Sequence, residues 1–122
     1  MFDHVSLKVS SFDESLAFYR AALAPLGHEA QFVDEAGKSA GFGPKGSPML
    51  WIAEGAAPGT VHLAFKAPSR GAVKGFHEAA VAKGGRDNGK PGPRPDYSDT
   101  YYAAFAFDPD GNNVEAVTFA PA

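Results

Sequence analysis

The sequence contains an internal repeat whose two copies lie 58 residues apart. The first copy begins at His4 with the segment HVSLKV, and the second begins at His62 with HLAFKA. Without gaps, the same offset also aligns Ser11 with Ser69, Phe18 with Phe76, and Gly27 with Gly85. In a chain of 122 residues, each copy is about half of the protein. The fold must therefore be built from two similar units.

Each unit is predicted to begin with a strand followed by a helix. Residues 2–9 alternate apolar and polar side chains, which is the period of a half-buried strand. Ser11 with Glu14 three residues later is the signature of a helix N-terminus, and apolar side chains then recur at helical spacing. In the second unit, a strand at about 60–67 precedes a helix that Ser69 opens and that ends near Ala82.

Further strands are expected after each helix. In the first unit we predict strands at about 28–34, 38–43 and 48–53, because glycine- and proline-rich turn segments separate them. In the second unit, segments 101–107 and 113–119 are predicted to form a hairpin, since the intervening DPDGN sequence favours a tight turn.

The stretch 86–100 is rich in glycine and proline, and we expect it to be largely irregular and to carry function. A short strand within it cannot be positioned from the sequence. The predicted class is α+β, with two tandem βαβββ modules at about 1–55 and 59–122 and a linker at 54–59, in one domain.

Composition narrows the classes of function. A net charge of −3 and a pI near 5.7 argue against nucleic acid or an anionic membrane surface as the main partner. The absence of cysteine excludes disulfides, thiolate metal sites and a cysteine nucleophile. No apolar run reaches the roughly 18 residues of a membrane span, and the first residues lead directly into a predicted strand. We expect a soluble, cytoplasmic protein without a signal peptide.

Three residues are candidate metal ligands. His4 and His62 occupy equivalent positions on the polar faces of two equivalent strands, and Glu115 lies among apolar residues of the last strand. A carboxylate in apolar surroundings is costly unless it is paired or bound to metal. Two histidines and one carboxylate form the ligand set of facial-triad sites. The alternative is that both histidines are half-exposed polar residues of their strands and bind no metal. His28 and His77 lack the support of the repeat and are interpreted as surface or packing residues.

A substrate pocket is expected beside these ligands. Aromatic residues at strand positions are compatible with a core or with a pocket, and Arg94 is compatible with anion binding or with a solvated loop charge. The predicted pocket residues are Phe42, Trp51, Arg94, Tyr97, Tyr101 and Phe105.

Four segments are similar to those of a known superfamily: 4–9 (HVSLKV), 15–19 (SLAFY), 61–65 (VHLAF) and 108–115 (DPDGNNVE). With them, nearly the whole chain resembles the vicinal oxygen chelate superfamily, which includes glyoxalase I, bleomycin-resistance proteins, extradiol dioxygenases and fosfomycin-modifying thiol transferases. The resemblance implies that the paired modules form a curved eight-stranded mixed sheet, or cup, with helices on its outer face. It also implies a homodimer, a small-molecule substrate, and a divalent ion (Zn, Mn, Ni or Fe) bound by His4, His62 and Glu115.

Departures from this pattern limit the activity that the resemblance implies. Trp51 stands where glyoxalase I has a fourth ligand, a glutamate, so a standard glyoxalase I reaction is not expected. Most extradiol dioxygenases are about twice as long, and the C-terminal segment 117–122 has no basic residue like those of the thiol transferases.

The resulting expectation is a metalloenzyme, a glyoxalase-like lyase or transferase, that uses a divalent metal as Lewis acid on vicinal oxygens of a small substrate. Isomerase, thiol transferase and dioxygenase types stay open. The alternatives are a metal-free binding or sequestration protein of the bleomycin-resistance type, and a degenerate member whose fold serves only dimer assembly.

Overall fold

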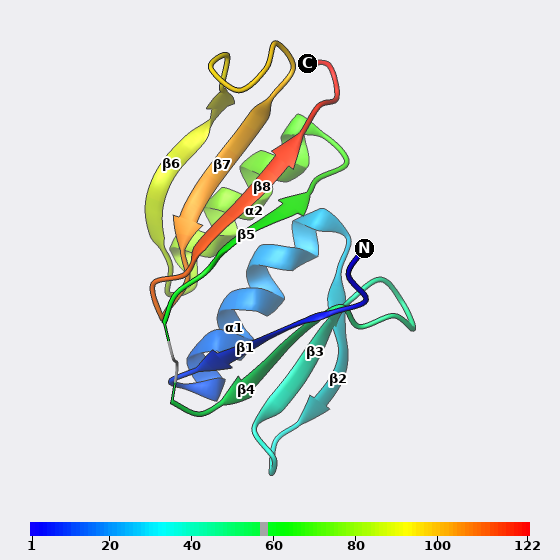
Figure 1. Ribbon diagram of the computed structural model, residues 1–122, viewed down its shortest axis with the longest axis vertical. Coiled ribbons are helices and arrows are strands. Elements are labelled where there is room, and N and C mark those ends of the chain that lie inside the picture. Colours follow the sequence, from blue (N-terminus) through cyan, green and yellow to red (C-terminus); the bar gives the residue numbers. More distant parts are fainter. Residues whose placement is uncertain (57–58) are drawn as a thin grey trace.

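The computed structural model describes residues 1–56 and 59–122, which form two βαβββ modules (Figure 1). Residues 57 and 58 of the expected linker lie outside the described residues. The elements of module 1 are β1 (Val5–Val9), α1 (Phe12–Leu23), the short 3₁₀ helix η1 (Ala24–Leu26), β2 (Glu29–Asp34), β3 (Ser39–Gly43) and β4 (Leu50–Glu54). Those of module 2 are β5 (His62–Lys66), α2 (Arg70–Ala82), β6 (Arg86–Pro93), β7 (Tyr102–Phe107) and β8 (Asn113–Thr118).

Each module has its own four-stranded mixed sheet, in the order β1-β4-β3-β2 for module 1 and β5-β8-β7-β6 for module 2. In both sheets the first strand runs parallel to the last, and the other pairs are antiparallel. The α+β class and the two tandem modules are thus confirmed. Within the described chain, the eight strands form two sheets rather than one continuous sheet, because β1 and β5 are both edge strands and do not pair with each other.

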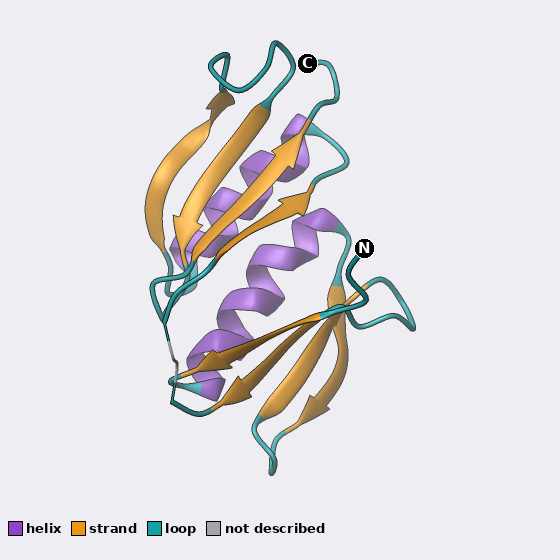
Figure 2. Cartoon of the chain, viewed as in Figure 1, coloured by secondary structure: helices purple, strands orange, loops and turns teal. Residues whose placement is uncertain are grey.

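The helices hold the modules together. Each helix covers one face of its own sheet, and α1 packs against α2, so that α1 is visible between β5 and β1 (Figures 1 and 2). The faces of the two sheets away from the helices carry the polar strand residues. On β1 and β5 these polar residues are Ser6, Lys8, His62 and Lys66, and His4 comes directly before β1; all of them are exposed.

Local sequence explains the helix boundaries. The Ser11 hydroxyl accepts a hydrogen bond from the Glu14 amide, and the Ser69 hydroxyl accepts one from the Ala72 amide, as N-cap residues do. The stripe that the sequence predicts for α1 is buried against the sheet: Phe12, Leu16, Tyr19, Leu23 and Leu26. Within residues 1–56 and 59–122, neither helix has the length and apolarity that crossing a membrane would require.

Segment 86–93 is a strand, although its composition favours irregular structure. β6 is the outer strand of its sheet and pairs only with β7, and its register shifts twice along its length. Proline lacks an N–H and is therefore tolerated on an edge strand, where one row of backbone groups needs no partner. The position of the strand at an edge, which the sequence does not reveal, allows it to contain prolines.

The turn between β7 and β8, residues 108–112, also joins the two modules. The buried Asp108 carboxylate accepts hydrogen bonds from the Tyr19 hydroxyl (2.6 Å), the Asn112 side-chain amide (2.8 Å) and two backbone amides. Because Tyr19 belongs to α1, this network fastens module 2 to the helix of module 1. Burial and the neighbouring Asp108 raise the pKa of Tyr19 well above its ordinary value, so the phenol stays a donor.

Candidate functional site

The centre of the candidate site is the Glu115 carboxylate on β8. It is only 2% exposed, although it lies on the face of the sheet away from α2. One oxygen, Oε1, lies 2.8 Å from Nε2 of His62 on the neighbouring β5, and the other, Oε2, accepts a hydrogen bond from the Tyr101 hydroxyl. His62 is half-exposed, with 52% of its side chain accessible, so one side of the pair faces solvent.

Tyr101 is held in place by aromatic neighbours. Its ring makes edge-on contacts with Tyr97 (5.0 Å between centroids) and Phe119 (5.3 Å). Partial burial, together with the hydrogen bond to Glu115 and the charge of that carboxylate, raises the pKa of Tyr101 to about 12. At neutral pH the phenol is therefore protonated and fixes the orientation of Glu115.

His4 has a different environment. It precedes β1, is about half-exposed, and its Nδ1 lies 2.7 Å from the carboxylate of the neighbouring and exposed Asp3. His4 also lines a shallow hollow on sheet 1, together with Ser6, Lys8 and Trp51.

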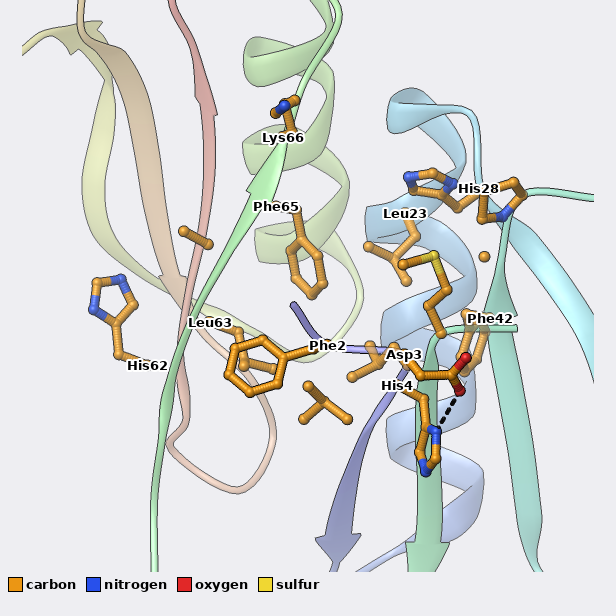
Figure 3. A pocket seen from close by; sticks show the side chains of 16 residues that line it. Phe2, Asp3, His4, Leu23, His28, Phe42, His62, Leu63, Phe65 and Lys66 are labelled. Carbon is orange, nitrogen blue, oxygen red and sulfur yellow. Dashed lines mark hydrogen bonds and ion pairs between the residues drawn. The ribbon is translucent and has the colours of Figure 1, made fainter. Parts of the chain in front are cut away.

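The three predicted ligands do not meet within one chain. His4 and His62 both border a groove of about 400 Å³ between the modules, and Figure 3 shows them on opposite sides of it, with Phe2 and Leu63 drawn between them. Among the described residues, no group of three or more His, Cys, Asp or Glu side chains is close enough to hold one ion. The structure thus unites His62 with Glu115 and leaves His4 apart.

The pair of His62 and Glu115 offers one nitrogen and one oxygen donor of the types that bind metal ions. Two ligands of a tetrahedral zinc ion, each about 2.0–2.2 Å from the metal, are roughly 3.4 Å apart. The 2.8 Å between His62 and Glu115 is a hydrogen-bond distance, so the two side chains would have to separate slightly to admit an ion. A buried carboxylate also needs a cation or hydrogen-bond donors, and among residues 1–56 and 59–122 its side-chain hydrogen-bond partners are His62 and Tyr101.

The strand register gives Trp51 a specific place. On β5 and β8, Ala64 lies opposite Glu115; on β1 and β4, Ser6 lies opposite Trp51. Because Ser6 and Ala64 are equivalent in the repeat, Trp51 occupies in module 1 the position that Glu115 occupies in module 2. Its ring packs against Phe32 at 5.7 Å between centroids.

Some of the remaining predicted pocket residues lie on the Glu115 face of module 2, and Phe42 lies in the core of module 1. Phe105 lies opposite Glu115 on β7, on the same face, and its ring is 6.2 Å from that of His62. The guanidinium of Arg94 lies over Phe105, and Tyr97 is 65% exposed. Phe42 is buried against Tyr19 of α1, although it also borders the groove between the modules, so it lies on the other side of its sheet from Trp51.

Comparison with known proteins settles the family. The sequence model of the "Glyoxalase/Bleomycin resistance protein/Dioxygenase superfamily" matches residues 1–116. The chain belongs to this superfamily. No curated protein matches the sequence.

Solved structures of the superfamily have the same fold. A glyoxalase/bleomycin resistance protein from Albidiferax ferrireducens is 29% identical, with a TM-score of 0.83 over 97% of this chain and 98% of that one. A glyoxalase/bleomycin resistance protein/dioxygenase family enzyme from Burkholderia phytofirmans is 16% identical, with a TM-score of 0.71 over 97% and 98%. A glyoxalase I variant from Zea mays is 21% identical, with a TM-score of 0.70 over 95% of this chain and 46% of that one.

Some contacts of the site could not be read from the sequence. The hydrogen bond from Tyr101 to Glu115 joins the residue before β7 to a residue on β8, and a tyrosine at this point of the sequence gives no sign of a polar partner. The hydrogen bond of Asn88 to Asn113 (3.1 Å) also has no signal in the sequence, because the composition of 86–93 hides the strand β6.

Proposed function

We propose that this chain is a metalloenzyme acting on a small molecule in the cytoplasm, and that two copies of the chain complete each site. His62 and Glu115 of one copy, with His4 of the other copy, would hold one divalent ion. The observation that carries the proposal is the close pair of His62 and buried Glu115, which is open to solvent on one side. A metal bound there would act as a Lewis acid on vicinal oxygens of the substrate.

A second copy is invoked because the chain leaves its strand edges and apolar side chains uncovered. β1 and β5 are edge strands that border the groove between the modules. Phe2 and Met49 also border this groove and are 75% and 45% exposed. A copy related by a twofold axis would cover both edges and bring the β1 end of one chain to β5 of the other.

The residues around the pair have separate tasks in this proposal. Tyr101 holds the second oxygen of Glu115, which leaves Oε1 directed at His62. Phe105 forms an apolar wall on the same sheet, and Trp51 contributes one from the partner copy. Trp51 offers neither a fourth ligand nor a general base, so the site differs from that of glyoxalase I and suits a different isomerase, a thiol transferase or a dioxygenase.

Metal analysis of protein purified without chelator tests the ligand set. We expect about one transition-metal ion per chain in the wild type. Glu115→Ala should retain almost none, because metal affinity depends on the number of protein side chains that coordinate the ion. Glu78→Ala, which changes a carboxylate on α2, is the control and is expected to keep its metal. Wild-type protein without metal, but with tight binding of an aromatic ligand, would instead support the sequestration function.

Mixing two inactive variants tests whether each site is shared. In a heterodimer of His4→Ala with Glu115→Ala, one site carries both changes and the other carries none. Random exchange should therefore restore metal to about a quarter of all sites, given a symmetric dimer. If mixing restores nothing while both variants remain dimeric by light scattering, the shared site is wrong.

A further inference from the structure

Arg94 lies across the same sheet face as Glu115. It follows β6, and its guanidinium carbon is 5.5 Å from the ring centre of Phe105. Phe105 is the register partner of Glu115, so only one strand spacing of about 4.8 Å separates their backbones. A charged group and the candidate ligand pair are thus near enough for one small molecule to contact both.

β6 has glycine at two positions next to the guanidinium of Arg94. A Cβ atom on Gly89 would lie 3.3 Å from Nη2 of Arg94, and one on Gly92 would lie 3.3 Å from Nη1, so a side chain at either position would crowd the guanidinium. Gly89 also has a φ of +155°, in the region that favours glycine. The two glycines therefore leave room for the guanidinium close to the strand.

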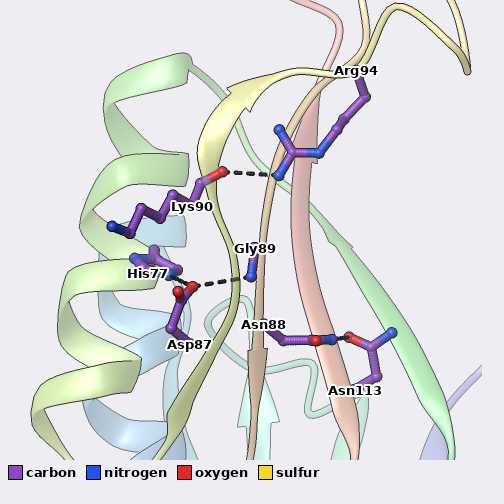
Figure 4. Close-up of polar contacts among 7 residues, drawn as sticks. All are labelled: His77, Asp87, Asn88, Gly89, Lys90, Arg94 and Asn113. Carbon is purple, nitrogen blue, oxygen red and sulfur yellow. Dashed lines mark hydrogen bonds and ion pairs between the residues drawn. The ribbon is translucent and has the colours of Figure 1, made fainter.

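Backbone carbonyls fix the guanidinium without neutralising it. Nη1 donates to the carbonyls of Gly92 (2.8 Å) and Pro93 (3.4 Å), and Nη2 donates to that of Lys90 (2.8 Å); Figure 4 shows the last of these bonds. Within the described part of the chain, Arg94 forms no ion pair, and Nε–H has no hydrogen-bond acceptor. The positive charge is therefore held rigidly and still available to an anion.

We propose that Arg94 binds a carboxylate of the substrate, which makes the substrate class an organic acid with an apolar or aromatic body. The acid group pairs with the remaining N–H donors of Arg94, because a guanidinium offers five and matches a carboxylate in shape. The body of the molecule lies against Phe105, and its opposite end reaches His62 and Glu115. This inference rests on the proposed function, since it assigns the substrate of that site.

Matched acids and esters test the charge requirement. The probes are benzoate, 3,4-dihydroxybenzoate, mandelate and 2-oxobutyrate, each compared with its methyl ester by thermal shift and then by titration calorimetry. At least one acid should bind the wild type about tenfold or more tightly than its ester, which corresponds to about 1.4 kcal/mol. Arg94→Gln should abolish this preference and leave ester binding unchanged.

Arg86→Gln is the matched control. Arg86 is the first residue of β6, with its guanidinium 5.0 Å from the ring centre of Phe107, so it shares the charge and the stacking but lies at the opposite end of the strand from Arg94. The Arg86→Gln variant should prefer acids over esters as strongly as the wild type does. If Arg94→Gln does not fold, Arg94→Lys replaces it and should reduce the preference, because ammonium lacks the planar fork.

Two results would overturn the proposal: no acid preferred over its ester by the wild type, or a preference that Arg94→Gln retains. Metal content measured on the same samples separates this failure from that of the proposed function. If the protein contains no metal but still prefers acids in a way that depends on Arg94, the proposed metalloenzyme function alone is overturned. Metal-bearing protein with no acid preference overturns the role of Arg94 alone.

Discussion

The two modules share one topology but carry different residues at the register position of the Glu115 carboxylate. In module 2, β7 and β8 place Phe105 opposite Glu115; in module 1, β3 and β4 place Gly41 opposite Trp51. A Cβ atom on Gly41 would lie 2.9 Å from the Trp51 ring, so the glycine makes room for the tryptophan. In module 1 the aromatic residue of the pair lies on the last strand, in module 2 it lies on the strand before the last, and of these four residues only Glu115 is a carboxylate. Equivalent histidines therefore have unequal partners.

The turns that precede the last strand of each module differ as well. In the turn 108–112, Asp108 and Asn112 are buried, and Asp108 bonds to the helix of the other module. In module 1, Gln31 contacts the corresponding turn at 44–48, where its side-chain oxygen accepts the Gly46 amide at an exposed position (2.8 Å). The turn of module 2 thus adds an inter-module hydrogen bond to the packing of α1 against α2.

The largest expected effect concerns this difference between the turns. Asp108→Ala should lower the free energy of unfolding by about 3 kcal/mol or more, because it leaves buried donors of Tyr19 and Asn112 without an acceptor. Gln31→Ala should cost about 1 kcal/mol or less, as an exposed substitution. Urea denaturation measures both. Equal losses of unfolding free energy in the two variants would mean that the two turns contribute equally to stability.

The next effect concerns Trp51 and Glu115. Trp51→Glu restores to module 1 the carboxylate that module 2 has at the same register, and we expect metal to bind about tenfold more tightly, or about 1.4 kcal/mol. Trp51→Phe, which keeps an aromatic ring, should leave metal affinity unchanged. Competition with a chelator measures the affinities. An unchanged affinity in Trp51→Glu would place the ion away from the module 1 face.

The smallest effect concerns one exposed carboxylate in each module. Glu54 accepts the Phe12 amide and pairs with Lys38, and Asp87 accepts the Gly89 amide and pairs with His77. In both cases the backbone hydrogen bond and then the side-chain hydrogen bond, from Lys38 or from His77, lower the pKa of the carboxylate below the ordinary 4.5 for Glu54 and 3.8 for Asp87.

Because the pKa of each carboxylate is lower in the folded than in the unfolded protein, its ionisation stabilises the folded state. This stabilisation is complete above the ordinary pKa and is lost as the pH falls through the lowered pKa of the folded protein. The melting temperatures of Glu54→Gln and Asp87→Asn should therefore be slightly below that of the wild type near pH 7 and converge with it near pH 2. A difference that persists unchanged in acid would show that ionisation plays no part.

The sequence alone determined the two modules, because hydrophobic periodicity and helix caps are local signals and the 58-residue repeat doubled each of them. It also singled out His4 and His62, which the repeat places at equivalent positions, and Glu115, since a carboxylate in an apolar strand is conspicuous. The sequence did not locate β6, because its prolines are tolerated only at a sheet edge, and edge position is a property of the assembled sheet.

Only the tertiary structure decided which side chains meet. The pairing of His62 with Glu115 depends on β5 lying beside β8, and the separation of His4 depends on α1 packing against α2 between the sheets. Likewise, the sequence identified Arg94 as a pocket candidate. The two glycines beside its guanidinium and its hydrogen bonds to three backbone carbonyls depend on the fold of β6. Contacts between residues far apart in sequence are set by packing geometry, which no local pattern encodes.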